Sequence, residues 1–435
     1  IVVNLADYER IRVVAIGKAS IEMAQGLARV LAPDVKLEGI VAAPHASLPN
    51  AFLPDAGLPN ASLPNAGAAD RVAIDGFRII RAGHPAPDEG SFLAAEAILD
   101  LLRGCDARTL VIFLLSGGGS SLVELPLDPA ITLAEMRELY RVLVGCGASI
   151  DEMNAVRKHL SAVKGGRLAA AAPAAMKVTL GVTDVPVGCE SALGSGPTIP
   201  DPTTLRDACR AVERYALLPK LPRAIRAKFE HPEEIPETPK AGDPAFALSR
   251  FTLLLGMNDL FHHAHRAAEA RGFKTVCDNS TDDWPLGRAA DYLLGELARL
   301  AAANPGRRVA LIADGEVSSP VIGDGVGGRN SAFVLDCVGK IALGVMRGAA
   351  RATNEMPGRK IAVLSAGTDG KDGSSPAAGA VADEETLARA RVHKLDPAEF
   401  ARHSDSYNFF CALGDTIETG PTGNNLRDLR VLLAE

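Results

Sequence analysis

Short apolar runs alternate with longer amphipathic segments along the first half of the chain. In the longer segments apolar residues recur at helical spacing, which predicts helices, whereas short runs rich in Val, Ile and Leu predict buried strands. We expect strands over residues 12–16, 38–43, 77–82, 109–115 and 177–182. Helices are expected over residues 20–32, 91–102, 132–145, 149–158 and 165–172. This order is typical of an α/β domain built on a parallel sheet.

The same alternation resumes in the second half, after an irregular stretch. Proline and charged residues dominate positions 218–244, so we expect a domain boundary near residue 240. The sequence therefore predicts two α/β domains, residues 1–240 and 245–435. In the second domain, strands are expected over 250–255, 308–313 and 360–366, and helices over 259–271 and from Asn330 onward.

Residues 48–66 form a low-complexity repeat in which Leu-Pro-Asn-Ala or Leu-Pro-Asp-Ala recurs with a period of five. Proline lacks a backbone N–H and fixes φ, so a proline in every repeat is compatible with neither a helix nor a strand ladder. We interpret this segment as an insertion that forms an exposed loop and carries no chemistry.

A turn rich in serine and glycine follows the predicted strand 109–115 directly. Such a backbone has little side-chain bulk and exposes N–H groups, which can close around an anion. A plain tight turn is the alternative interpretation, and composition alone does not separate the two. The residues of this turn are Ser116, Gly117, Gly118, Gly119, Ser120 and Ser121.

Polar residues also occupy other strand ends of the first half. Lys18 follows the first strand and Asp184 follows the fifth, at the sheet edge where α/β proteins bind ligands. A solvated loop lysine is the alternative for Lys18, and His84 is interpreted as a turn residue. A polar stripe precedes Asp184, for which a solvated helix face is the alternative. The stripe consists of Asn154, Arg157, Lys158, Ser161, Lys164 and Arg167.

Residues 323–328 satisfy the pattern G-x-G-x-x-G of dinucleotide-binding loops, so an NAD enzyme has to be considered. The surroundings disfavour it, because the glycines do not leave a long strand directly and no second strand ends in a suitably spaced acidic residue. We predict instead a second anion-binding loop, which presents Arg329 and opens a helix at Asn330. Further glycine-rich turns follow at 367–373 and 420–425.

Composition narrows the classes of function. The 435 residues are 47% hydrophobic and 23% charged, with a formal net charge of −7, which gives no electrostatic footprint for nucleic acid. The seven cysteines show neither a C-x-x-C pair nor metal-ligand spacing, which favours a reducing compartment. No apolar run reaches membrane-spanning length and no secretory leader opens the chain. We therefore expect a cytoplasmic protein without nucleic-acid or membrane partners.

Several motifs, taken together and in order, resemble one family. They lie at 116–121, 154–161 with 164–169, 195–198, 327–330, 367–373 and 420–424. In this combination the chain resembles the class II glycerate kinases, the MOFRL family. The resemblance implies a larger Rossmann-like, doubly wound domain plus a smaller α/β domain, with the site in the cleft between them. It also implies ATP-dependent phosphorylation of D-glycerate with Mg²⁺, usually at the 2-hydroxyl.

The resemblance further implies that Lys18 and Arg329 are essential, and we expect them to neutralise the γ-phosphate and the glycerate carboxylate. Asp184 is our candidate to orient or deprotonate the substrate hydroxyl, and Asp369 or Glu316 to help hold Mg²⁺. The remaining motif residues are expected to contact substrate or nucleotide. They are the six residues of the 116–121 turn together with Asn154, Arg157, Lys164, Gly328, Asn330, Thr368, Thr422 and Asn424.

Two alternative functions remain open. An NAD(P)H-dependent hydroxypyruvate reductase rests on the G-x-G-x-x-G match alone. A non-catalytic sugar-acid-binding protein would keep the anion loops without the chemistry, and segments 187–190 and 314–320, which differ from the usual family pattern, are the hints toward it. A homodimer is also left open, because nothing in the sequence determines assembly.

Overall fold

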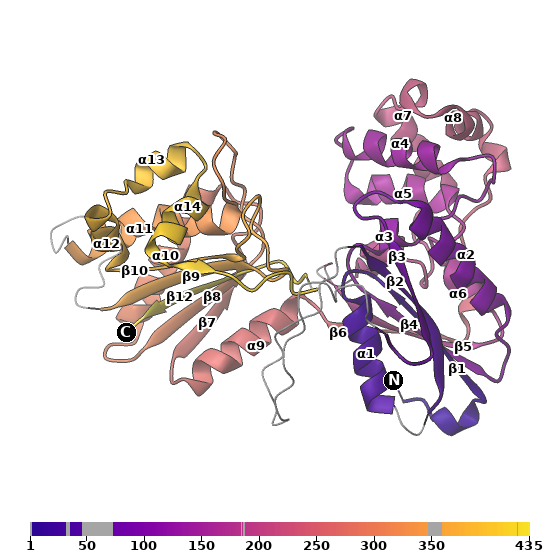
Figure 1. Ribbon diagram of the computed structural model, residues 1–435, viewed down its shortest axis with the longest axis horizontal. Coiled ribbons are helices and arrows are strands. Elements are labelled where there is room, and N and C mark those ends of the chain that lie inside the picture. Colours follow the sequence, from indigo (N-terminus) through magenta and orange to yellow (C-terminus); the bar gives the residue numbers. More distant parts are fainter. Residues whose placement is uncertain are drawn as a thin grey trace. The chain divides into compact units, whose positions relative to one another are not determined.

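The computed structural model describes residues 2–31, 35–45, 73–183, 185, 188–346, 359–423 and 425–435. The predicted insertion at 48–66 and the candidates Asp184 and Asn424 lie outside these residues. The chain divides into two compact units, Ile1–Leu255 and Gly256–Glu435 (Figure 1). The expected site between the two domains stays a prediction.

The first unit is built on a six-stranded parallel sheet with the order β3-β2-β1-β4-β5-β6. This is the order of doubly wound dinucleotide-binding folds, in which the strands diverge on either side of β1 and β4. The predicted Rossmann-like fold is therefore confirmed. The strands are β1 (Arg10–Ile16), β2 (Leu37–Pro44), β3 (Phe77–Ala82), β4 (Thr109–Leu115), β5 (Met176–Val182) and β6 (Ser249–Leu255).

Both faces of this sheet are buried, because successive side chains of each strand point to opposite faces. On β1, Val13 and Ala15 pack with Ala24 of α1, whereas Val14 and Ile16 belong to the core under α2. In Figure 1 these helices lie on opposite sides of the strands. The helices of the unit are α1 (Ser20–Leu31), α2 (Glu89–Arg103), α3 (Gly119–Leu122), α4 (Leu133–Val144), α5 (Ile150–Leu160), α6 (Arg167–Ala170), α7 (Leu205–Arg214) and α8 (Arg223–Glu230).

Helices α4, α5, α7 and α8 form a separate helical layer with its own apolar core. The start of α4 follows from its sequence: the side chain of Thr132 accepts a hydrogen bond from the backbone N–H of Glu135, and the carboxylate of Glu135 accepts one from the backbone N–H of Thr132. This reciprocal capping satisfies N–H groups that an α-helix leaves unpaired at its first turn. The predicted capping box is confirmed.

The strand predicted over residues 250–255 is present but belongs to the first unit. β6 pairs with β5 in parallel, from Lys177 opposite Ser249 to Val182 opposite Leu255. The sequence analysis assigned this strand to the second domain because it follows the proline-rich stretch at 218–244. That stretch instead carries α8 and short 3₁₀ turns of the first unit.

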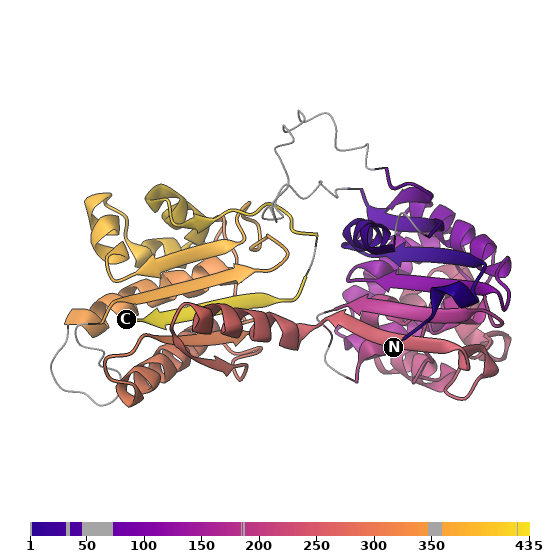
Figure 2. The same ribbon diagram turned by 90° about the horizontal axis from the view of Figure 1, so that it is seen from below.

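The second unit has a mixed sheet with the order β11-β10-β9-β12-β8-β7. The C-terminal strand β12, yellow in Figure 2, runs antiparallel between β8 and β9. Its first residue, Asp428, lies opposite Gly367, so the start of β12 meets the carboxyl ends of β8 and β9. The strands are β7 (Lys274–Asp278), β8 (Val309–Asp314), β9 (Ile361–Gly367), β10 (Gly379–Asp383), β11 (Thr416–Ile417) and β12 (Asp428–Ala434).

One apolar core joins this sheet to two long helices. Leu293 and Leu297 of α10 and Phe333 and Val338 of α11 pack with inward residues of the strands, such as Leu311. The predicted smaller α/β unit is confirmed. Its helices are α9 (Met257–Ala270), α10 (Leu286–Ala303), α11 (Arg329–Met346), α12 (Thr386–Val392), α13 (Pro397–Arg402) and α14 (Ser406–Leu413).

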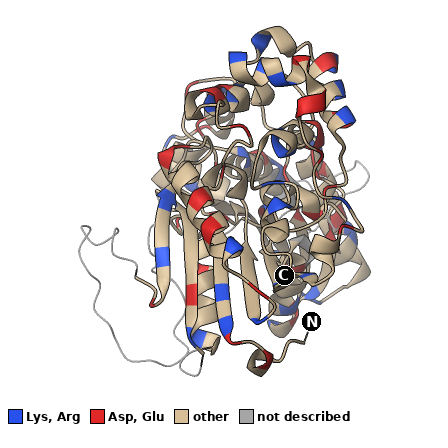
Figure 3. Ribbon diagram, turned by 90° about the vertical axis from the view of Figure 1, so that its right-hand side faces the viewer, with Lys and Arg blue, Asp and Glu red and all other residues tan. Residues whose placement is uncertain are grey.

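Charged residues of both signs are distributed over the helices and strands. Figure 3 shows Lys and Arg interspersed with Asp and Glu on the face in view. In the part of the chain that the structure describes, none of the helices combines the length and hydrophobicity needed to span a lipid bilayer.

The turns that follow β1 and β4 are in direct contact. Gly17 has φ +130°, and a Cβ atom there would lie 2.1 Å from the hydroxyl oxygen of Ser116. The backbone N–H of Lys18 donates to the carbonyl of Gly117 at 2.9 Å, and the N–H of Ala19 donates to the Ser116 hydroxyl at 3.0 Å. Glycine is required at position 17 both by the backbone conformation and by the close approach.

We expect Gly17→Ala to lower the free energy of unfolding by about 2–5 kcal/mol, because the methyl group adds a steric clash to an unfavourable φ. Urea denaturation measures the change. Gly26→Ala is the matched control: Gly26 lies in α1 with open space where the Cβ would stand, so this variant should be more stable by about 0.5–1 kcal/mol. Equal stabilities of the two variants would contradict the contact.

Candidate active site

Lys18, the Ser/Gly turn and His84 meet at the carboxyl edge of the first sheet. A Cβ atom placed on Gly118 would lie 3.2 Å from Cγ of Lys18 and 3.2 Å from Cε1 of His84. The ring nitrogen Nδ1 of His84 lies 3.0 Å from the hydroxyl of Ser121. Three turns far apart in the sequence, after β1, β3 and β4, thus come together around a backbone without side chains.

The backbone of the Ser/Gly turn keeps its N–H groups available. Gly118 has φ +85° and precedes α3, so the N–H groups of Gly117, Gly118 and Gly119 come before the first turn of that short helix. Within the described residues, no acceptor bonds these three groups. Successive unpaired N–H groups are suited to an anion. This arrangement favours the anion-cradle interpretation over a plain tight turn.

A hydrogen-bonded chain leads from the turn into the protein. The hydroxyl of Ser195 donates to Oδ1 of Asn154 at 3.0 Å, and the hydroxyls of Ser120 and Ser195 are 2.7 Å apart. Because the single proton of the Ser195 hydroxyl is donated to Asn154, the Ser120 hydroxyl donates to Ser195. The oxygen of Ser120 then remains an acceptor, which suits a ligand that offers a hydroxyl group.

The charge of His84 is set by its surroundings. Partial burial, followed by the positive charge of Lys18, lowers the pKa of the His84 imidazole below its usual 6.5. A lowered pKa leaves the ring neutral near pH 7, so it can accept a proton there. The sequence analysis treated His84 as a turn residue and missed this position.

Beneath the turn lies a buried polar network centred on Glu124. Its carboxylate accepts hydrogen bonds from Nζ of Lys164 at 2.7 Å, from Tyr140 at 2.8 Å and from Ser161 at 2.6 Å. The carbonyl of Ser120 lies 2.7 Å from the same Tyr140 hydroxyl and shares its one proton with Glu124. Burial lowers the pKa of Lys164, and the contact with Glu124 opposes that shift. The network ties the loop to the helical layer.

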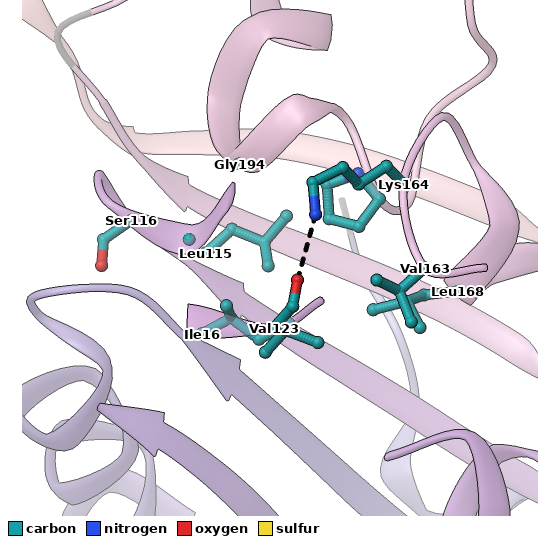
Figure 4. A pocket seen from close by; sticks show the side chains of 10 residues that line it. Ile16, Leu115, Ser116, Val123, Val163, Lys164, Leu168 and Gly194 are labelled. Carbon is teal, nitrogen blue, oxygen red and sulfur yellow. Dashed lines mark hydrogen bonds between the residues drawn. The ribbon is translucent and has the colours of Figure 1, made fainter. Parts of the chain in front are cut away.

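The residues of the polar stripe are mostly buried, so the solvated-face alternative was wrong for them. The guanidinium of Arg157 lies 4.4 Å from the ring centre of Tyr140, and the ammonium of Lys158 contacts Asp201 at 3.0 Å. Lys164 lines a cavity of about 10 Å³ under the loop (Figure 4). That space holds about one water molecule, so the environment favours a structural role for Lys164 rather than the expected ligand contact.

The second unit contains a much larger cavity, of about 1350 Å³. Arg329 and Asp369 line it together with Asp428. Nε of Arg329 donates to Asp428 at 2.5 Å, and Nη2 contacts Glu316 at 2.7 Å. Burial opposes the charge of Arg329, but Asp428 and Glu316 outweigh it and raise the pKa of the guanidinium. Among the described residues, no acceptor contacts its Nη1.

The G-x-G-x-x-G segment does not form an open anion loop, contrary to our expectation. Asp372 accepts hydrogen bonds from the backbone N–H groups of Asn330 and Ser331, both at 2.8 Å, at the start of α11. The N–H groups of Val326 and Gly327 donate to the side chains of Asp405 and Ser374. The chain's own side chains thus occupy the groups that would bind a pyrophosphate. A Cβ on Gly328 would lie 2.3 Å from Oδ1 of Asp372.

Three other residues that were predicted to contact substrate or nucleotide bond to neighbouring parts of this unit. The hydroxyl of Thr368 donates to the carbonyl of Arg427 at 2.6 Å, and that of Thr422 donates to the carbonyl of Thr368 at 2.5 Å. The side-chain oxygen of Asn330 accepts from Ser365 at 2.5 Å. The two threonine bonds fasten the turns after β9 and before β12 to each other, and the third bond ties α11 to β9.

The two candidate metal ligands, Glu316 and Asp369, have different hydrogen-bond and ion-pair partners. Glu316 is held by Arg329, whereas Asp369 accepts from the backbone N–H of Lys371 at 3.0 Å in its own turn. Across the residues that the structure describes, no group of three His, Cys, Asp or Glu side chains could hold a metal ion. Mg²⁺ commonly takes one or two carboxylates and completes its shell with water and substrate phosphates, and the Asp369 carboxylate fits that requirement.

Charged groups that the sequence analysis did not single out surround the start of β12. Asp314 ends β8 and is buried, and burial raises its pKa to about 6, with the negative charge of Asp282 adding to the effect. Arg427 pairs with Asp282 through two hydrogen bonds, at 2.7 and 2.6 Å. Arg430 is fully buried and donates to the carbonyls of Asp314 and Gly315.

Two family models match successive parts of this chain. Residues 2–230 match the family described as a domain of unknown function (DUF4147), and residues 309–428 match the MOFRL family. The D-glycerate 2-kinase of Thermotoga maritima is 32% identical over 97% of this chain and 90% of its own length. The chain belongs to the glycerate 2-kinase (MOFRL) family.

Two further relatives describe the range of this family. A protein of Agrobacterium vitis named "Putative hydroxypyruvate reductase" is 37% identical over the whole of this chain and 90% of its own. The crystal structure of a glycerate kinase from Thermotoga maritima superimposes with a TM-score of 0.81, at 30% identity, over 99% of this chain and 92% of that one. The recognition of a kinase family from the ordered motifs is confirmed.

Some residues of the candidate site could have been found from the sequence. Asp372 and Gly373 lie in a motif that was recognised, and a carboxylate there can cap a following helix. His84 follows a predicted strand in the same way as Lys18 and Ser116, and that shared position was the available signal. Asp314 and Asp428 have no local signal, because their environment depends on the pairing of β12 with β8 and β9.

We expect Lys164→Met to lower the free energy of unfolding by about 3–5 kcal/mol, because it leaves the buried carboxylate of Glu124 without its counter-charge. Lys36→Met is the matched control: the side chain of Lys36 is 86% exposed beside Glu38, so the change should stay within about 0.5 kcal/mol. Urea denaturation gives both values. A Lys164→Met protein of normal stability that had lost ligand affinity would return Lys164 to the binding residues.

Asp314→Asn tests the raised pKa through stability. Because the pKa of Asp314 is about 6 in the folded protein against an ordinary 3.8, its stabilising contribution is complete below about pH 4 and is lost as pH rises through 6. The variant stays neutral, so its stability relative to the wild type should rise by about 2–4 kcal/mol between pH 4 and pH 8. Denaturation at both pH values measures this. A constant difference would show that Asp314 ionises normally.

Proposed function

We propose that this protein is an ATP-dependent kinase that phosphorylates D-glycerate at its 2-hydroxyl. The observation that carries the proposal is the open cradle of Gly117, Gly118 and Gly119 N–H groups beside Lys18. The full-length likeness to the D-glycerate 2-kinase of Thermotoga maritima supports the substrate and the product. The kinase name of that relative supports ATP as the phosphoryl donor.

Phosphoryl transfer gains most of its rate from positioning and from cations around the transferring group. In our proposal the cradle and Lys18 bind phosphate oxygens of the nucleotide. Ser120 accepts a hydrogen bond from the 3-hydroxyl of the substrate, because its own proton is directed to Ser195. A substrate with adjacent hydroxyl and carboxylate groups suits these donors and acceptors.

Arg329 is proposed to bind one oxygen of an anionic group through Nη1. A bidentate contact is not available without rearrangement, since Nε and Nη2 already contact Asp428 and Glu316. The pair of carboxylates keeps the guanidinium in a fixed orientation, which favours recognition at a defined position over a general electrostatic attraction.

Mg²⁺ is proposed as the metal cofactor, with Asp369 as the protein ligand. When bound, the ion would neutralise charge on the nucleotide phosphates. Asp369 lines the large cavity of the second unit and has no cationic partner among the described residues. Glu316 is less suited to this role because Arg329 holds it.

The alternative functions receive less support. The reductase depended on the G-x-G-x-x-G segment, whose N–H groups are occupied by side chains such as Asp372 and Asp405. A purely binding protein would not need a neutral imidazole beside a lysine. We also propose a cytoplasmic location, which the seven free cysteines support. A homodimer stays a prediction.

The test is incubation of the purified protein with MgATP and D-glycerate, with enolase present and no mutase. Formation of phosphoenolpyruvate would report the 2-phosphate directly. We expect Lys18→Ala and Arg329→Ala each to lower kcat at least about 100-fold, since each removes a cation from the transferring phosphate or the substrate. Lys36→Ala, on the same unit as Lys18, is the control. Normal turnover in both variants, or no product from the wild type, would refute the proposal.

A further inference from the structure

The geometry points to His84 as the general base of the proposed reaction: Nε2 of its imidazole takes the proton of the substrate 2-hydroxyl, and Ser121 fixes the ring. This inference rests on the proposed function and names a residue for it. Three observations carry it: the position of the ring, the contacts of its two nitrogens, and its accessibility.

The ring lies beside the place that the attacking hydroxyl would occupy. His84 and Lys18 both lie against Gly118, since a Cβ on Gly118 would lie 3.2 Å from an atom of each side chain. A phosphate held by the cradle and Lys18 would therefore lie next to the imidazole. A general base needs this proximity first and a suitable pKa second.

The contacts of the ring assign one role to each nitrogen. The hydroxyl of Ser121 lies 3.0 Å from Nδ1 and is directed to the carbonyl of Gly118 at 3.4 Å. In the tautomer that the proposal needs, Nδ1–H donates to the Ser121 hydroxyl and that hydroxyl donates to Gly118, which leaves the lone pair on Nε2. In the described part of the chain nothing bonds Nε2, and the partly buried residue keeps some of its surface in contact with solvent.

The charged groups around the ring agree with a neutral base. Lys18, from the turn after β1, is the cation that acts on His84. Asp88, the residue that caps the start of α2, is engaged elsewhere: it contacts His45 at 2.6 Å and accepts from the backbone N–H of Ser91. The carboxylate nearest along the chain therefore does not hold the imidazole in its protonated form.

The step balances without a further reagent. The O–H proton of the 2-hydroxyl passes to Nε2 of His84 as the oxygen forms its bond to the γ-phosphorus. The bond from that phosphorus to the β,γ-bridging oxygen breaks, and the electron pair leaves with ADP. The imidazolium then releases its proton to solvent, to which the side chain is exposed.

His84→Asn is the decisive variant, because the Asn amide can keep an N–H near Nδ1 while the lone pair of Nε2 is lost. We expect kcat to fall about 100-fold or more, with a KM for D-glycerate close to that of the wild type. The fall of kcat at acidic pH should disappear with it. His45→Asn is the matched control, since His45 pairs with Asp88 outside the cradle; its kcat should be unchanged.

Ser121→Ala separates orientation from structure. It should lower kcat less than His84→Asn does and should raise the fraction of the other ring tautomer. Nitrogen NMR of protein labelled at histidine reports the tautomer, with the His84 signal assigned by its loss in His84→Asn. Free imidazole should restore part of the activity of His84→Ala, which a purely structural role would not allow.

Several outcomes would overturn the inference. Normal kcat in His84→Asn would do so, as would an acid limb that survives in His84→Asn but vanishes in Asp184→Asn, which would make Asp184 the base. If the wild type transfers no phosphate, the proposed function fails separately. The NMR then decides: a His84 Nε2 signal that D-glycerate leaves unmoved overturns the inference, and a shifted signal supports a hydroxy-acid site at this ring.

Discussion

The contact between Gly17 and Ser116 is the constraint on which the first-unit site depends. β1 and β4 are neighbours at the point where the strand order diverges, so the turns that leave them must share one space. A glycine at position 17 lets the two backbones approach until Lys18 bonds to Gly117. The same approach directs the Ser116 hydroxyl to the start of α1, which leaves the N–H groups of the next three glycines for a ligand.

The two glycine-rich loops of this chain have similar compositions and opposite states. In the first unit, Gly118 and its neighbours keep their N–H groups unpaired among the described residues. In the second, Asp372, Ser374 and Asp405 occupy the corresponding groups. Buried N–H groups need partners, so a loop packed against other turns is satisfied by the chain itself, whereas a loop at an open sheet edge is not. Packing, more than composition, decides which loop can bind an anion.

The same distinction explains what the sequence could predict. Strands 77–82 and 109–115 and the capping box at Thr132 depend on local patterns, and they were predicted correctly. The sheet to which β6 belongs depends on its pairing with β5, which lies far away in the sequence. The burial of Lys164 also depends on distant residues, and helical spacing alone suggested a solvated stripe. Lys18 was recognised by motif. His84 was not, because its chemistry arises only when the turn after β3 meets Gly118.

The buried charges beneath the cradle are best understood as a rigid support. An ion pair such as Glu124–Lys164 adds little stability compared with apolar residues of the same size, because both charges lose hydration. Its geometry is nevertheless demanding: Glu124 accepts from Lys164, Ser161 and Tyr140, and Tyr140 also bonds the carbonyl of Ser120. A loop without side-chain anchors, such as 117–119, has to be fixed through its backbone. Such fixation increases the rate of phosphoryl transfer, because a displaced hydrogen-bond donor loses most of its effect on the transition state.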